Sequence, residues 1–129
     1  MFGDTGDDLL IGDKGADELT GGSGADTFRF LSAANSRQGE GNHDTIQDFR
    51  TNEDVIDIKR IDANALQGGN QSFNYIRGNE FTGTAGELRL EVRGSWTLVQ
   101  GDLNGDAVTD FEIEILTGDH VLVSSDFIL

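Results

Sequence analysis

A nine-residue unit, repeated three times between Gly3 and Arg29, constrains the fold of this chain more than any other feature. The copies read GDTGDDLLI, GDKGADELT and GGSGADTFR, and no insertion separates them. Each copy has two glycines three positions apart, an aspartate two positions later and a large apolar residue two positions after that. A flexible linker does not keep an apolar residue in register in this way. The pattern indicates a repeat architecture whose stacked units bury a continuous core.

The glycines and aspartates of the unit indicate calcium binding. Glycine allows the positive φ values of tight turns, so backbone carbonyls can approach an ion. Calcium takes about six to eight oxygen ligands, which carbonyls and carboxylates supply. Two carboxylates about 4 Å apart repel each other by roughly 4 kcal/mol at an effective dielectric near 20, which is comparable with the stability of a small domain. We therefore predict that calcium is part of the fold. The candidate ligands in the repeats are Asp4, Gly6, Asp8, Asp13, Gly15, Asp17, Gly22, Gly24 and Asp26.

The charge of the chain agrees with a cation-binding role. Acidic residues number 24 and basic residues 9, giving a formal net charge of -15. This charge argues against nucleic acids and anionic membrane surfaces as partners. No apolar run is long enough to cross a membrane, and no secretory signal pattern opens the sequence. The chain has no cysteine, so a secreted form needs a source of stability other than disulfides.

Alternating apolar residues predict short strands beyond the repeats. These strands are expected at 27–31, 43–49, 55–58, 87–93, 96–100 and 111–115. The last three form an antiparallel meander, whose outward charges are expected to pair across the sheet without forming a binding patch. His43 is expected to be a solvated loop residue. Asp44 and Asp48 are either further calcium ligands, which close the last site of the repeats, or plain surface residues.

A second candidate calcium loop lies between the last two predicted strands. Asp102, Asn104, Asp106 and Asp110 stand at loop positions 1, 3, 5 and 9, the spacing of oxygen ligands in an EF-hand loop. The loop departs from that pattern with Ala at position 6 and Ile at position 12. Two interpretations remain open, a weaker calcium site and a turn rich in Asp and Asn for conformational reasons.

Several of these motifs together resemble the C-terminal RTX domain of serralysin-type secreted metalloproteases of peptidase family M10. They are GGSGADTFRF, HDTIQDF, DVIDI, FTGTAGELR, GDLNGDAVTDFEI and the terminal DFIL. The resemblance implies an all-β fold, with a parallel β-roll over residues 1–30 packed on an antiparallel β-sandwich or meander over residues 31–129. It also implies export by type I secretion machinery that recognises Asp126, Phe127, Ile128 and Leu129. The zinc motif HExxH of such proteases is absent from the sequence.

The resemblance also implies how the repeats stack. Each nonapeptide makes half a turn of the roll, so loops on the same side are eighteen residues apart. Gly3–Asp8 should then lie beside Gly21–Asp26, with Asp8 and Asp26 around one shared calcium ion. Gly12–Asp17 should lie on the opposite side, near the stretch around Asp44 and Asp48.

Two functions follow from these expectations. The first is a non-catalytic, calcium-dependent folding and secretion module, whose partners are calcium ions, an upstream catalytic domain and the type I secretion machinery. The alternative is a calcium-dependent carbohydrate-binding module that resembles the R-modules of alginate (mannuronan) epimerases. The arginines are scattered among acids, whereas a polyuronate would require a basic stripe. Catalysis within this chain lacks support, because no nucleophile, base and orienting group occur together.

Overall fold

The computed structural model of the chain describes residues 1–33, 36–37, 41–51, 53–64, 66, 68, 71–117 and 121–129. Strands dominate this part of the chain, and one 3-10 helix, η2 (Ser124–Asp126), precedes the last strand. The strands are β1 (Leu9–Ile11), β2 (Glu18–Leu19), β3 (Thr27–Arg29), β4 (Asp44–Ile46), β5 (Val55–Asp57), β6 (Asn74–Arg77), β7 (Glu87–Arg93), β8 (Trp96–Asp102), β9 (Phe111–Leu116) and β10 (Phe127–Ile128).

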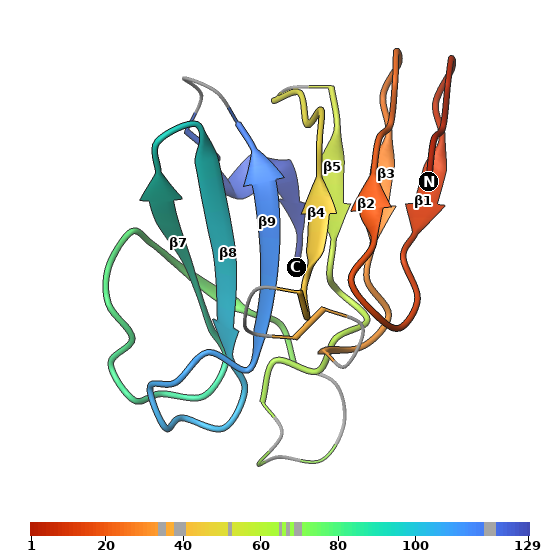
Figure 1. Cartoon of the computed structure of the whole chain (residues 1–129). Coiled ribbons are helices and arrows are strands. Elements are labelled where there is room, and N and C mark those ends of the chain that lie inside the picture. The colour runs from red at the N-terminus through yellow and green to blue at the C-terminus, as the bar shows by residue number, and fades with distance from the viewer. Residues whose placement is uncertain are drawn as a thin grey trace.

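The strands form two sheets that pack face to face (Figure 1). One sheet is parallel throughout and has the order β1-β3-β5-β10. The other has the order β2-β4-β9-β8-β7-β6, with antiparallel pairing of β7, β8 and β9 and parallel pairing of β2, β4 and β9. The predicted all-β fold, a parallel roll joined to an antiparallel meander, is therefore confirmed.

Consecutive repeats alternate between the two sheets. β1 and β3 pair in parallel with Leu9 opposite Thr27, so eighteen residues separate paired positions. β2, from the middle repeat, lies in the other sheet and pairs with β4 through Glu18 and Thr45. Each nonapeptide therefore makes half a turn, as the resemblance implied.

The apolar position of each repeat lies in the core between the sheets. Leu10, Leu19 and Phe28 are at most 2% exposed and belong to one cluster. The same cluster includes Ile56 and Ile113 of the sandwich part. Burying each of these side chains contributes about 1.5–3 kcal/mol. Strands from both sides of the predicted domain boundary at residue 30 thus enclose a single core.

The C-terminal strand completes the parallel sheet. β10 pairs with β5, with Phe127 opposite Ile56, and the Phe127 ring packs 5.6 Å from the ring of Tyr75, centroid to centroid. The backbone N–H of Val123 donates to Asp126 Oδ2 over 2.8 Å, which fixes the turn of η2 ahead of β10. Asp126 and Phe127 are consequently buried.

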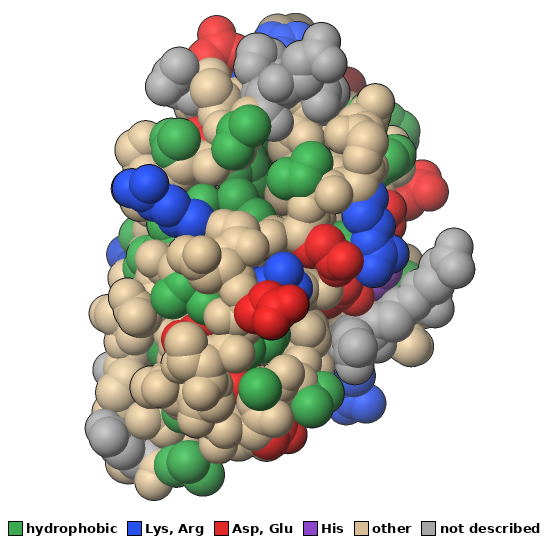
Figure 2. Space-filling view, turned by 90° about the vertical axis from the view of Figure 1, so that its left-hand side faces the viewer, with side chains coloured by type: hydrophobic (Ala, Val, Ile, Leu, Met, Phe, Trp, Pro, Cys, Tyr) green, Lys and Arg blue, Asp and Glu red, His purple; other side chains and the backbone are tan. Residues whose placement is uncertain are grey.

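The core is less covered at the β6 edge of the six-stranded sheet. An apolar hollow of about 530 Å³ lies there, between β6, β7 and residues 121–124. Figure 2 looks onto this side of the molecule and shows hydrophobic side chains grouped in its upper half. Val92 and Val121 on its rim are 60% and 67% exposed.

Candidate calcium sites

The turns of the first and third repeats are stacked in backbone contact. The N–H of Ser23 donates to the carbonyl of Asp4 over 2.9 Å, and the N–H of Gly6 donates to the carbonyl of Ser23 over 2.8 Å. Gly22 has a φ of 92°, and a Cβ there would overlap the Asp4 carbonyl oxygen. Only glycine fits this position, because both its φ and the close approach exclude a side chain.

Two aspartates meet beneath these turns. The backbone N–H of Asp8 donates to Asp26 Oδ1 over 3.0 Å. The second oxygens, Asp8 Oδ2 and Asp26 Oδ2, are buried without a hydrogen-bond partner among the described residues. Leaving such oxygens unpaired is costly, since a buried charge needs a compensating partner. The predicted juxtaposition of these two loops is present, and its oxygen donors suit a hard cation such as calcium.

The middle repeat meets Asp44 on the opposite side of the roll. The backbone N–H of Asp17 donates to Asp44 Oδ1 over 2.8 Å, and Asp44 Oδ2 is buried without a partner in the described part of the chain. A Cβ on Gly12 would lie 2.5 Å from that oxygen. Burial, together with the neighbouring Asp17 charge, raises the pKa of Asp44 to about 6. Asp13 and Gly15 of this loop are exposed.

Asp48 was expected near the middle repeat, but its side chain contacts the third repeat instead. Its Oδ1 accepts the backbone N–H of Gly21 over 2.8 Å, and its Oδ2 accepts that of Gly22 over 2.7 Å. Both oxygens therefore bind the turn of the third repeat. Asp44 alone of the two predicted residues faces the Gly12–Asp17 loop.

Asp54 continues the aspartate stack and was not among the predicted ligands. Its Oδ1 accepts the backbone N–H of Asp26 over 2.9 Å, and its Oδ2 accepts that of Arg50 over 2.8 Å. Burial raises its pKa. The signal was present in the sequence, because Asp54 precedes β5 as Asp8 precedes β1 and Asp26 precedes β3.

The loop between β8 and β9 brings its predicted residues together. Asp102, Asp106 and Asp110 each place a carboxylate oxygen within 4.8 Å of the others. Asp102 Oδ1 accepts the N–H of Gly105 over 2.9 Å, which folds the loop around this buried carboxylate. Asn104 lies on the same turn, where its Oδ1 accepts the N–H of Asp106 over 3.2 Å. Ala107 has a φ of 62°, the conformation for which an EF-hand loop uses glycine.

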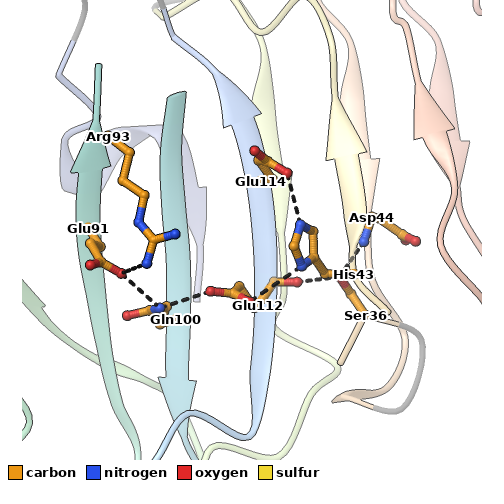
Figure 3. A network of polar contacts seen from close by, with 8 residues as sticks. All are labelled: Ser36, His43, Asp44, Glu91, Arg93, Gln100, Glu112 and Glu114. Atoms are coloured by element: carbon orange, nitrogen blue, oxygen red, sulfur yellow. Dashed lines mark hydrogen bonds and ion pairs between the residues drawn. The ribbon is translucent and has the colours of Figure 1, made fainter. Parts of the chain in front are cut away.

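His43 is buried, so the expectation of a solvated loop residue is wrong. The side chain is 8% exposed. Its Nδ1 lies 3.4 Å from Glu112 Oε2 and its Nε2 lies 2.9 Å from Glu114 Oε2 (Figure 3). The cause is the parallel pairing of β4 with β9, which places the residue before Asp44 beside these two glutamates.

The fold and its stacked aspartates define the class of this protein, a β-roll module of the calcium-binding repeat type. The family model described as "Peptidase M10 serralysin C terminal" matches residues 1–129. The chain therefore belongs to the serralysin C-terminal family of peptidase M10. Membership implies calcium binding, and C-terminal domains of this family belong to secreted proteins and are not catalytic. No helix among the described residues is long and apolar enough to cross a membrane.

Solved structures with a similar fold include two subunits of one enzyme. The AlgE6R3 subunit of the mannuronan C5-epimerase from Azotobacter vinelandii is 27% identical with a TM-score of 0.63, and the match covers 98% of this chain and 65% of that one. The AlgE6R2 subunit of the same enzyme is 29% identical with a TM-score of 0.63, and the match covers 94% of this chain and 70% of that one. No curated protein matches the chain.

If Asp8 and Asp26 share one ion, substitutions at the two positions should lower the free energy of unfolding non-additively. We expect Asp8→Asn and Asp26→Asn to be coupled by on the order of 1 kcal/mol or more, because each removes one charge from the same site. Asparagine keeps the Oδ1 acceptor that binds the Asp8 N–H, so the coupling reports the shared ion. Asp8→Asn and Asp17→Asn should add within about 0.5 kcal/mol. The free energy of unfolding in calcium measures both cycles, and coupling of Asp8 to Asp17 instead would contradict the assignment.

Calcium binding at Asp44 should weaken at acidic pH. Its folded pKa, about 6, lies above the ordinary value. Without metal, this carboxyl therefore stabilises the fold at low pH, and that stability is lost as the pH rises through about 6. The ion requires the ionised form, so calcium affinity has the opposite slope and falls as the pH drops below about 6. Calcium titrations at several pH values measure this, with Asp44→Asn as the control that should remove the dependence. An unchanged slope in that variant would contradict the prediction.

Proposed function

We propose that this chain is the calcium-dependent folding and secretion module of a larger secreted enzyme, a serralysin-like metalloprotease. The observation that carries the proposal is the set of buried carboxylate oxygens without a partner among the described residues, on Asp8, Asp26 and Asp44. They lie beside the turns of the roll, where a bound calcium ion would neutralise them. The family match supports an upstream catalytic domain, since the sequence itself has no HExxH motif.

The residues act in two groups on opposite sides of the roll. Asp8 and Asp26, with the carbonyls near Asp4 and Gly6, would hold one ion. Asp17 and Asp44 would hold another. When bound, calcium supplies the positive charge that makes close stacking of these carboxylates favourable. The aspartates therefore keep the turns apart at low calcium, and the net charge of -15 adds to this repulsion.

The loop between β8 and β9 is a further calcium site in this proposal. Its three carboxylates converge, and Ala107 already has the left-handed conformation of an EF-hand turn. The residue at loop position 12 is Ile113, whose buried side chain offers no oxygen. This loop should therefore bind calcium more weakly than the repeats.

The tail Asp126–Leu129 is the secretion signal in this proposal. Its support is the resemblance of an acidic residue followed by apolar residues at the C-terminus to the signals of serralysin-type proteins. The type I secretion machinery is then the second partner of the chain.

Polysaccharide binding is the second candidate function. It is favoured by the similarity to two subunits of a mannuronan C5-epimerase. Under this alternative the chain would hold an alginate-like polyuronate, and titration with alginate oligomers separates it from a purely structural role. The excess of acidic residues disfavours an anionic ligand.

We expect the chain to be largely unfolded without calcium and to fold at about 10⁻⁴ to 10⁻³ M calcium, the range of extracellular modules. Circular dichroism during a calcium titration measures the transition. Asp26→Asn should shift the midpoint to higher calcium, because it removes a charge at a buried site. Glu53→Gln removes the same charge at an exposed position and should leave it unchanged. A β-sheet spectrum that persists in excess chelator would sink the proposal.

Altering the tail should block export without unfolding the domain. Ile128 is 37% exposed, so Ile128→Glu should leave calcium-dependent folding nearly intact while it lowers type I secretion of a fused passenger several-fold. Val121→Glu introduces the same charge at an exposed apolar residue outside the tail and serves as the control. Secreted passenger in the medium is the measurement. Normal secretion of the Ile128→Glu fusion would assign the tail a purely structural role.

A further inference from the structure

A polar hollow lies on the outer face of the six-stranded sheet, and Ala107 and Thr109 of the loop between β8 and β9 line one side of it. It has a volume of about 500 Å³, within the range of small-molecule sites. β7, β8 and β9 form its floor, Phe81 and Thr109 come from neighbouring loops, and Trp96 lies at the start of β8. We call it the β7–β9 hollow. Sequence patterning indicated no binding patch on these strands.

A row of hydrogen-bonded side chains fixes the floor of the hollow. Arg89, Gln100 and Glu112 stand opposite one another on β7, β8 and β9. Arg89 donates from a guanidinium nitrogen to Gln100 Oε1 over 2.6 Å, and Gln100 Nε2 donates to Glu112 Oε1 over 2.9 Å. Because the row is held before any ligand arrives, little side-chain freedom is lost on binding.

The residues beside this row expose further hydrogen-bonding groups to solvent. Gln100 also donates to Glu91 Oε2 over 3.3 Å, and Arg93 donates to the same oxygen over 3.2 Å (Figure 3). The Arg93 side chain is 65% exposed, so most of its donors face solvent. The Glu114 side chain is 32% exposed and offers acceptors. The hollow thus presents both donors and acceptors.

Trp96 supplies an apolar platform at one end. It is half-buried and stands opposite Arg93 in the β7–β8 register. Within the described residues, no hydrogen bond from its indole N–H is found. At Phe81 the Arg89 guanidinium already lies over one face of the ring, 5.7 Å from its centre. An aromatic face beside planar polar groups suits a ligand that is apolar on one side and hydroxylated at its rim.

The charge of the hollow selects among such ligands. Arg89 and Arg93 face three carboxylates, on Glu91, Glu112 and Glu114, and His43 lies between the last two, so the hollow has no excess of positive charge. It therefore offers a polyuronate no net electrostatic attraction. A nucleotide is disfavoured for the same reason. A cation would compete with Gln100 and His43 for carboxylates that already accept hydrogen bonds.

We propose that the β7–β9 hollow binds a neutral oligosaccharide, with one pyranose ring stacked on Trp96. Sugar hydroxyls both donate and accept, so they match the exposed guanidinium of Arg93 and the carboxylates of Glu91 and Glu114. This activity is distinct from calcium binding and from the role of the tail, although the hollow borders the loop between β8 and β9. It also differs from polyuronate binding, because the ligand carries no charge.

The single tryptophan of the chain makes the test direct, since its emission reports on this hollow alone. The full chain, folded in calcium, is titrated with cellohexaose, laminarihexaose and maltohexaose, and with a mannuronate hexamer as the anionic comparison. We expect a saturable change in Trp96 emission with at least one neutral hexasaccharide and none with the uronate. A neutral series that gives neither an emission change nor heat in calorimetry, with native circular dichroism, overturns the proposal. Tighter binding of the uronate overturns it equally.

Variants locate the binding site. Trp96→Ala, followed by calorimetry, should weaken binding about three- to tenfold, the worth of one aromatic stack. Arg93→Gln should weaken binding several-fold with little effect on folding, because its side chain is largely exposed. Arg50→Gln is the matched control, an exposed arginine whose ion pair with Glu53 lies outside the hollow. Equal affinity of Arg93→Gln and Arg50→Gln, together with unchanged binding by Trp96→Ala, would place the ligand elsewhere and overturn the assignment.

Discussion

Aspartates stacked under glycine turns control this fold, because they are held in backbone contact while part of their charge has no partner in the described protein. Asp8, Asp26 and Asp54 follow one another on one side of the roll, each connected to the next by a backbone N–H. These hydrogen bonds fix the spacing, but the Oδ2 atoms of Asp8 and Asp26 are buried without a partner among the described residues. Calcium, which membership of the family implies, would supply a compensating charge for them. The roll is thus a scaffold for carboxylates, and its own strands are too short to be stable alone.

The roll and the meander are energetically one unit. β3 pairs with β5, and β4 pairs with β9, so each sheet crosses from the repeats into the later part of the chain. A single cluster of apolar side chains lies between the sheets. Whatever stabilises the turns therefore stabilises the meander, including the rigid row beneath the β7–β9 hollow. This coupling lets a few charged turns decide whether the whole domain is ordered.

Much of the fold could be predicted from local patterns. The period of nine placed Leu10, Leu19 and Phe28 in the core, and period-two alternation located β7 and β9. The misses share a physical cause, which is dependence on distant pairing. His43 is buried because β4 meets β9 far along the chain, and the two residues of β10 show no alternation of their own. The backbone partners of Asp48 and Asp54 depend on which turns lie beside them in the folded stack, and the local sequence does not show this.

The parallel sheet is completed out of sequence order, and this sets the timing of its assembly. β10 joins β5 across about seventy intervening residues, a separation that makes contact formation slow. Until that contact forms, Asp126 and Phe127 are free side chains; afterwards they are 2% and 7% exposed. Folding therefore removes these two side chains from solvent. Any receptor that recognises these two side chains has to bind the protein before β10 pairs with β5.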